Sequence, residues 1–143
     1  MSRSVLLFSL FPMLAACAQP APLPLDQGLA RVNLESSTRG SLQAYRLDGE
    51  LLHKLRFPDL TPGPHRLQMR YRFEVPGASS GMGERLSGSH WRRCILALDA
   101  DFTAGEHYRI SAWRLGWRAH ARLENAAGEQ LARAQVLRCG PGV

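Results

Sequence analysis

Apolar and polar side chains alternate without a break over residues 66–75. Odd-numbered positions from 67 carry Leu, Met, Tyr, Phe and Val, and even-numbered positions carry Arg, Gln, Arg, Arg and Glu. Successive side chains of a β-strand point to opposite faces of a sheet, whereas a helix repeats its apolar residues every three or four positions. The segment therefore predicts a strand with one buried and one solvated face, as is typical of an antiparallel sheet.

Shorter patterns of the same kind predict strands on both sides of this segment. Asp48-Gly49 favours a tight hairpin turn between strands at 42–47 and 51–57, because glycine adopts positive φ at little cost. Downstream, the same alternation predicts three more strands, at residues 94–98, 108–112 and 117–124.

Residues 129–137 are ambiguous because they consist largely of good helix formers. We favour a strand, since hairpin pairing after the turn at 125–128 would bury the segment, and a helix is the alternative. Residues 29–143 would then hold seven or eight short strands. This predicts one all-β domain, an antiparallel β-sandwich of immunoglobulin-like or transthyretin-like type.

The first 16 residues have the order of a secretory signal peptide. Arg3 supplies a positive charge, an apolar run covers residues 5–14, and small residues follow. A run of about 10 residues is too short for a transmembrane helix, which needs about 20. Residues 18–28 contain three prolines and one charged side chain, which predicts an extended, flexible tether.

Leu14-Ala15-Ala16-Cys17 resembles the lipobox of bacterial lipoproteins. The resemblance implies cleavage before Cys17, a diacylglyceryl group on its thiol and an acylated amine, and several acyl chains anchor a protein far more firmly than one. Ala18 stands where an inner-membrane retention signal would place Asp, so we expect the outer membrane, with the domain facing the periplasm. An ordinary signal peptidase site beside a cysteine is the alternative. The expected units are a signal peptide at 1–16, a lipidated cysteine and tether at 17–28, and the sandwich at 29–143.

Two further cysteines, Cys94 and Cys139, are left to pair with each other. An oxidising compartment favours a disulfide between them. Such a bond would hold the C-terminal segment against a central strand and stabilise the domain by about 4 kcal/mol in the chain-entropy account. A pair of free thiols and half of a metal site are the alternatives.

The chain after residue 16 carries 17 basic and 12 acidic side chains, and Lys54 is its single lysine. A GC-rich genome also produces such an arginine bias, and an exported protein meets little nucleic acid, so we do not expect nucleic-acid binding. If the strands at 66–75 and 117–124 are neighbours, their exposed arginines form one patch for phosphate or carboxylate groups. The candidate residues are Arg66, Arg70, Arg72, Arg118 and Arg122, with His120 beside them.

Lipopolysaccharide, peptidoglycan carboxylates, anionic head groups or an acidic protein would fit such a patch. A solvated sheet face without a ligand is the alternative. Of the three tryptophans, Trp91, Trp113 and Trp117, we expect at least two in the core because of their area. Trp113 falls on the face opposite to its apolar neighbours and is a weak candidate for contact with a sugar or peptide.

Gly77-Ala78-Ser79-Ser80-Gly81 matches the G-x-S-x-G motif of hydrolases, and Asp99 and His107 follow in hydrolase order. That motif needs a strand that turns into a helix above a parallel sheet, a context that this chain does not predict. Asp99 and Asp101 are better explained by turn chemistry, and the histidines lack the spacing of a helical ligand pair. We therefore expect no catalytic residue, no metal and no cofactor.

Three stretches resemble the PEGA-like domains of small bacterial envelope lipoproteins: 45–50 with its Asp-Gly turn, 59–67 with Pro-Gly-Pro-His, and 102–108 with Ala-Gly. The resemblance covers residues 42–125 and implies a β-sandwich on the envelope without catalysis. The glycine-rich loop at 77–90 is an insertion relative to it. We expect a non-catalytic binding or structural accessory module, and an enzyme or enzyme subunit acting on peptidoglycan or another glycan is the alternative.

Overall fold

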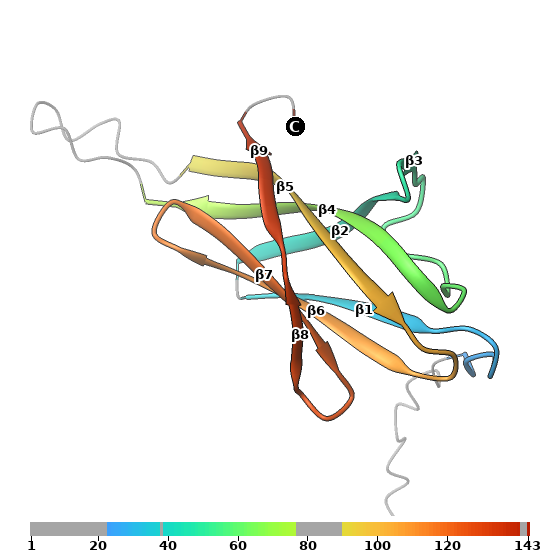
Figure 1. Cartoon of the computed structure of the whole chain (residues 1–143). Coiled ribbons are helices and arrows are strands. Elements are labelled where there is room, and N and C mark those ends of the chain that lie inside the picture. Colours follow the sequence, from blue (N-terminus) through green and yellow to red (C-terminus); the bar gives the residue numbers. More distant parts are fainter. Residues whose placement is uncertain (1–22, 38, 77–89, 141–142) are drawn as a thin grey trace, which may run out of the picture.

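The computed structural model describes residues 23–37, 39–76, 90–140 and 143, and this part of the chain is an all-β sandwich (Figure 1). The fold class is as predicted, with nine strands where seven or eight were expected. Within the described ranges no helix is long and apolar enough to cross a bilayer. The strands are β1 (Arg31–Ser36), β2 (Gly40–Leu47), β3 (Glu50–Leu51), β4 (Gly63–Val75), β5 (His90–Phe102), β6 (His107–Leu115), β7 (Arg118–Asn125), β8 (Gln130–Arg133) and β9 (Gln135–Cys139).

The strands form two sheets, which Figure 1 shows as an upper and a lower layer. The five-stranded sheet has the order β3-β2-β4-β5-β9, and the four-stranded sheet has the order β1-β6-β7-β8. The long strands β4 and β5 pair in antiparallel register from Gly63 opposite Phe102 to Val75 opposite His90. β1 and β6 pair in parallel, which departs from the antiparallel expectation. The chain passes from β1 into the other sheet, so no hairpin imposes an antiparallel partner on β1.

The inner face of β4 lies at the centre of the core. Tyr71 stacks on Phe73 with ring centroids 4.8 Å apart, and Ile110 and Leu123 of the other sheet are fully buried. Burying a side chain of this size contributes about 1.5–3 kcal/mol. The alternation predicted for β4 is confirmed, because its five apolar residues are at most 1% exposed: Leu67, Met69, Tyr71, Phe73 and Val75.

The predicted hairpin at Asp48-Gly49 forms, with positive φ at both residues as a tight turn of this kind requires. Its second strand is much shorter than the expected 51–57, because β3 covers only Glu50–Leu51. Beyond β3, two backbone hydrogen bonds still join this segment to β2, from Leu52 N to Tyr45 O and from Ala44 N to Leu55 O. Residues 52–57 therefore stay beside the sheet edge without regular strand pairing, and Phe57 turns into the core while Leu55 is 64% exposed.

The C-terminal segment is extended, which confirms a strand over a helix at 129–137. β8 pairs with β7 and β9 pairs with β5, so the segment crosses from one sheet to the other near Ala134. Cys139 lies opposite Cys94 in the register and forms the predicted disulfide with it. The bond fixes β9, which is an edge strand of the five-stranded sheet, to its neighbour β5.

The last residues of the predicted tether contact the domain. Arg31 donates hydrogen bonds of 2.8 and 2.7 Å to the carboxylate of Asp59, and the same guanidinium contacts the carbonyl oxygens of Leu23 and Pro24. Leu29 and Ala30 continue directly into β1. Cys17 and the rest of the tether lie outside the described residues.

Candidate functional site

The five arginines of the predicted patch lie on opposite sides of the sandwich. Arg66, Arg70 and Arg72 alternate with the buried residues of β4, so they face outward from the five-stranded sheet. Arg118 and Arg122 face outward from the four-stranded sheet, because Ala119 and Ala121, which alternate with them on β7, are buried. β4 has β2 and β5 as neighbours, and β7 has β6 and β8. The condition for a single patch, that the two strands are neighbours, is not met.

Arg122 belongs to an ion-pair network on the four-stranded sheet. Its Nη2 lies 3.0 Å from Glu124 Oε1, and Arg109 Nε lies 3.3 Å from Glu124 Oε2. The Glu124 side chain is only 7% exposed, so both guanidiniums are needed to offset the cost of burying its charge. Arg122 also lies over the ring of Trp113, with its guanidinium carbon 5.5 Å from a ring centroid. These contacts give Arg122 a structural role.

Arg66 is also paired, because its Nη1 lies 3.2 Å from Asp99 Oδ2. Both side chains are exposed. Asp101 shares the outer face with Asp99. His107 begins β6 in the other sheet, and no hydrogen bond joins it to Asp99 among the residues that the structure describes. Ser79 lies outside those residues. Asp99 therefore acts as the partner of an arginine in this fold.

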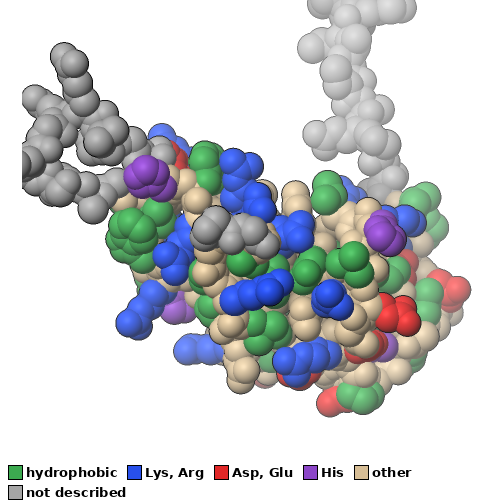
Figure 2. Space-filling view, turned by 90° about the horizontal axis from the view of Figure 1, so that it is seen from above, with side chains coloured by type: hydrophobic (Ala, Val, Ile, Leu, Met, Phe, Trp, Pro, Cys, Tyr) green, Lys and Arg blue, Asp and Glu red, His purple; other side chains and the backbone are tan. Residues whose placement is uncertain are grey.

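Two adjacent rows across the five-stranded sheet carry four arginines on its outer face. One row contains Arg70, Ile95 and Arg138, and the next contains Arg72 and Arg93. In the described strands, no carboxylate stands within these two rows. Figure 2 looks onto the sandwich from this side, with Lys and Arg side chains spread over the surface between hydrophobic ones and acidic side chains gathered toward one end. The arginine face consists of Arg70, Arg72, Arg93, Arg138, Tyr45 and Trp91.

Aromatic rings hold two of these guanidiniums in place. The guanidinium carbon of Arg72 lies 4.2 Å from the ring centroid of Trp91, and that of Arg70 lies 4.8 Å from the ring centroid of Tyr45. Each contact of this kind is worth about 0.5–1 kcal/mol at an exposed site. Arg70 Nε is buried and has no hydrogen-bond partner in the described part of the chain. Stacking on the aromatic rings thus orders Arg70 and Arg72 and leaves guanidinium N–H groups available to donate hydrogen bonds to a ligand.

Arginines of this face contribute to a lowered pKa of Tyr45. A hydrogen bond from Arg46 has the largest effect on the pKa of this phenol, burial opposes it, and the charges of Arg46, Arg138 and Arg70 lower the pKa further. Nearby positive charge stabilises the phenolate and lowers the pKa of the phenol. The same potential attracts other anions.

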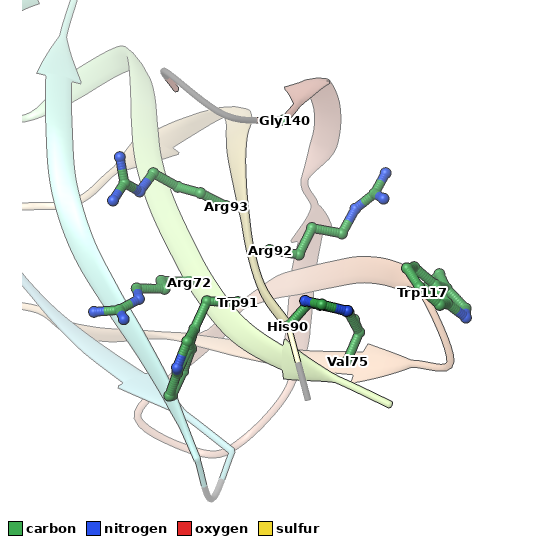
Figure 3. A pocket seen from close by; sticks show the side chains of 8 residues that line it. All are labelled: Arg72, Val75, His90, Trp91, Arg92, Arg93, Trp117 and Gly140. Carbon is green, nitrogen blue, oxygen red and sulfur yellow. The ribbon is translucent and has the colours of Figure 1, made fainter. Parts of the chain in front are cut away.

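A cavity of about 340 Å³ lies at the start of β5, next to the arginine face (Figure 3). In Figure 3, β5 runs between two groups of side chains: Arg72, Trp91 and Arg93 lie on one side, and Arg92 and Trp117 lie on the other. The remaining lining residues are Val75, His90 and Gly140. This volume suits a small ligand, and we refer to this space as the β5 cavity.

No family model, curated protein or solved structure matches the chain. The geometry of the arginine face and of the β5 cavity therefore has to support any functional assignment. Neither region includes a metal-ligand cluster, and within the described ranges no three His, Cys, Asp or Glu side chains come together in a way that could hold a metal ion.

The expectation that at least two tryptophans are buried is wrong. Trp91 is 54% exposed and Trp117 is 49% exposed, while Trp113 is half-buried and stacks on His120 with ring centroids 5.7 Å apart. Trp91 stands on the outer side of β5, and Trp117 lies in the tight turn between β6 and β7, where none of the nine strands of the described chain covers it. Both tryptophans line the β5 cavity.

The sequence analysis missed Arg92, Arg93, Arg138 and Tyr45. Trp91, Arg92 and Arg93 follow one another, so no alternation marks which of them face the core. Arg138 joins the face only through the pairing of β9 with β5, a contact between distant parts of the chain. The one available signal was Cys94, because a disulfide to Cys139 places Arg138 beside Ile95.

Proposed function

We propose that this protein is a non-catalytic binding module of the bacterial envelope, anchored in the outer membrane through a lipidated Cys17 and facing the periplasm. In this proposal the arginine face binds an anionic envelope component that carries phosphate or carboxylate groups. The observation that supports it best is the pair of adjacent rows with four guanidiniums and no carboxylate between them. A solvated face without a ligand would not require these guanidiniums to lie close together or to stack on aromatic rings.

Electrostatics favours this assignment. Four like charges on neighbouring positions repel one another, and an anion bound among them relieves that repulsion. Planar guanidiniums bind phosphate and carboxylate oxygens through paired hydrogen bonds, and Arg70 and Arg72 are already ordered by Tyr45 and Trp91. Less side-chain entropy is then lost on binding.

The anchor is tested with Cys17→Ser. Cells that express the wild-type chain should incorporate a labelled fatty acid into the protein, and the substitution should abolish the label and release the protein from the membrane fraction. A variant that stays membrane-bound, together with a wild type that takes up no label, contradicts the anchor.

The binding face is tested on the released Cys17→Ser protein by co-sedimentation with isolated envelope fractions. The double substitution Arg70→Gln/Arg138→Gln should reduce retention several-fold at low salt, with the difference shrinking as salt increases. Arg118→Gln/Arg133→Gln removes the same charge from the four-stranded sheet and is the matched control. Equal retention of both double variants contradicts a role for the arginine face.

A further inference from the structure

We propose that the β5 cavity binds a phosphate-bearing amphiphile, with the phosphate held by Arg92 and His90 and the apolar part against Trp117 and Val75. This inference rests on the proposed function, because it names the ligand class for one end of the same surface. The cavity is nevertheless lined by residues that the arginine-face test leaves unchanged, so the two proposals can fail separately.

The charge of the lining points to an anion with more than one negative charge. Arg72, Arg92 and Arg93 contribute three guanidiniums to the cavity, His90 adds an imidazole, and none of its described lining residues is acidic. Arg92 and His90 extend from one face of β5, whereas Arg72 and Arg93 extend from the other (Figure 3). A phosphate beside Arg92 and His90 can accept hydrogen bonds from both side chains through different oxygens, and the other two guanidiniums add to the positive potential at this end of β5.

One donor in the cavity lacks an acceptor. Arg92 Nε is buried and has no hydrogen-bond partner in the ranges that the structure describes. A buried donor without a partner costs about 1–3 kcal/mol, and more when the group is charged. Arg93 is held differently, because its Nη1 donates a 2.8 Å hydrogen bond to the backbone oxygen of Val143. Because Arg93 points to the other side of β5, Arg92 is the guanidinium that can bind the ligand directly (Figure 3).

The aromatic and aliphatic lining indicates that the ligand is more than a bare phosphate. Trp117 is 49% exposed although it is a large apolar side chain, and Val75 lies on the same side of β5 (Figure 3). A bare inorganic anion would leave these surfaces in water. An apolar group attached to the phosphate would cover them, at about 25 cal/mol per Å² of apolar surface removed from water.

Isothermal titration calorimetry tests this on the purified full chain in dilute nonionic detergent, with a detergent blank subtracted. The probes are hexyl phosphate, inorganic phosphate and hexanol. We expect hexyl phosphate to bind at least about tenfold more tightly than either fragment. Equal binding of inorganic phosphate and hexyl phosphate contradicts the apolar part, and equal binding of hexanol contradicts the anion site. Absence of binding by all three overturns the proposal.

Site variants assign the binding to the cavity. Arg92→Gln should weaken the binding of hexyl phosphate by about tenfold, and the binding of inorganic phosphate by a similar factor. Trp117→Leu should weaken only the binding of hexyl phosphate. Arg118→Gln and Trp113→Leu are the matched controls on the outer face of the four-stranded sheet and should change neither affinity. Unchanged affinity in both site variants, with unfolding temperatures like that of the wild type, contradicts the site.

A fourth probe separates the two sources of such a ligand. Dihexanoyl phosphatidic acid presents the phosphate as a lipid head group, whereas hexyl phosphate represents a soluble phosphate ester. Tighter binding of the lipid supports a membrane lipid as the source, and equal or weaker binding supports a soluble ester. If the cavity binds these probes but Arg70→Gln/Arg138→Gln leaves envelope retention unchanged, the arginine-face proposal fails and this one stands.

Discussion

His65 Nδ1 lies 2.6 Å from Asp48 Oδ2, which ties the start of β4 to the turn between β2 and β3. Asp48 Oδ1 also accepts a 2.8 Å hydrogen bond from the backbone amide of Arg66. On the other side of the ring, His65 Nε2 lies 2.8 Å from the carbonyl oxygen of Thr61. Acceptors at both ring nitrogens favour the doubly protonated imidazolium. One charged contact thus joins two stretches of the chain, 45–50 and 59–67.

This contact makes stability depend on pH. Burial lowers the pKa of His65, but the hydrogen bonds to Asp48 and Thr61 outweigh it and raise the pKa above 6.5. The Arg66 amide and then His65 lower the pKa of Asp48 below 3.8. A raised histidine pKa stabilises the fold below pH 6.5 and loses that effect as pH rises through the folded-state value. A lowered aspartate pKa stabilises it above pH 3.8 and loses that effect toward lower pH.

We therefore expect the contact to contribute most between about pH 4 and 6.5, by up to about 1 kcal/mol, the range of partly exposed ion pairs. Denaturant unfolding at pH 5.5 and 8.5 measures this. The free energy of unfolding of wild type minus that of His65→Gln should be larger at pH 5.5. His53→Gln, an exposed histidine, is the control. A difference that does not change with pH contradicts the charged contact.

The disulfide between Cys94 and Cys139 closes a segment with a sequence separation of 45. Restricting the unfolded chain over this length stabilises the domain by about 4 kcal/mol in the chain-entropy account. Cys94→Ala/Cys139→Ala should lose most of this stability in denaturant unfolding, and a reducing agent should destabilise the wild type but leave the double variant unchanged. A wild type that is insensitive to reduction contradicts the bond.

Glu124 lies buried between Arg109 and Arg122, so removing its charge leaves two guanidiniums without their shared partner. Glu124→Gln should lower the free energy of unfolding by about 3 kcal/mol. Glu35 also pairs with Arg109, at 3.8 Å, but its side chain is 58% exposed, so Glu35→Gln should cost less than about 1 kcal/mol. Similar losses in the two variants contradict the role assigned to burial.

The elements of the fold that could be predicted from the sequence are those specified by residues close together in the chain. Alternation over residues 66–75 predicted β4 because one face of that strand is buried along its whole length. Asp48-Gly49 predicted its turn because the chemistry of the turn is local. The irregular course of the chain after β3 and the parallel pairing of β1 with β6 depend on contacts between distant parts of the chain, which neighbouring residues do not specify.

The candidate site was predictable only in part for the same reason. Arg70 and Arg72 were assigned correctly to the outer face of a strand, but which arginines stand beside them depends on the order of strands in the sheet. That order placed Arg118 and Arg122 on the opposite side and brought Arg93 and Arg138 from distant parts of the chain. Exposed Trp91 and Trp117 escaped prediction because tryptophan is usually buried in a small domain.

In-cell photo-crosslinking tests the central claim most directly. A photoreactive amino acid replaces Gln68 on the outer side of β4 next to Arg70, or Arg133 of β8 in the other sheet as control. Mass spectrometry then identifies what is captured. We expect an envelope component with phosphate or carboxylate groups to be captured from position 68 and not from position 133, with less capture when Arg70→Gln/Arg138→Gln is added. Equal capture from both positions, or capture that is unaffected by the double substitution, contradicts an anion-binding arginine face.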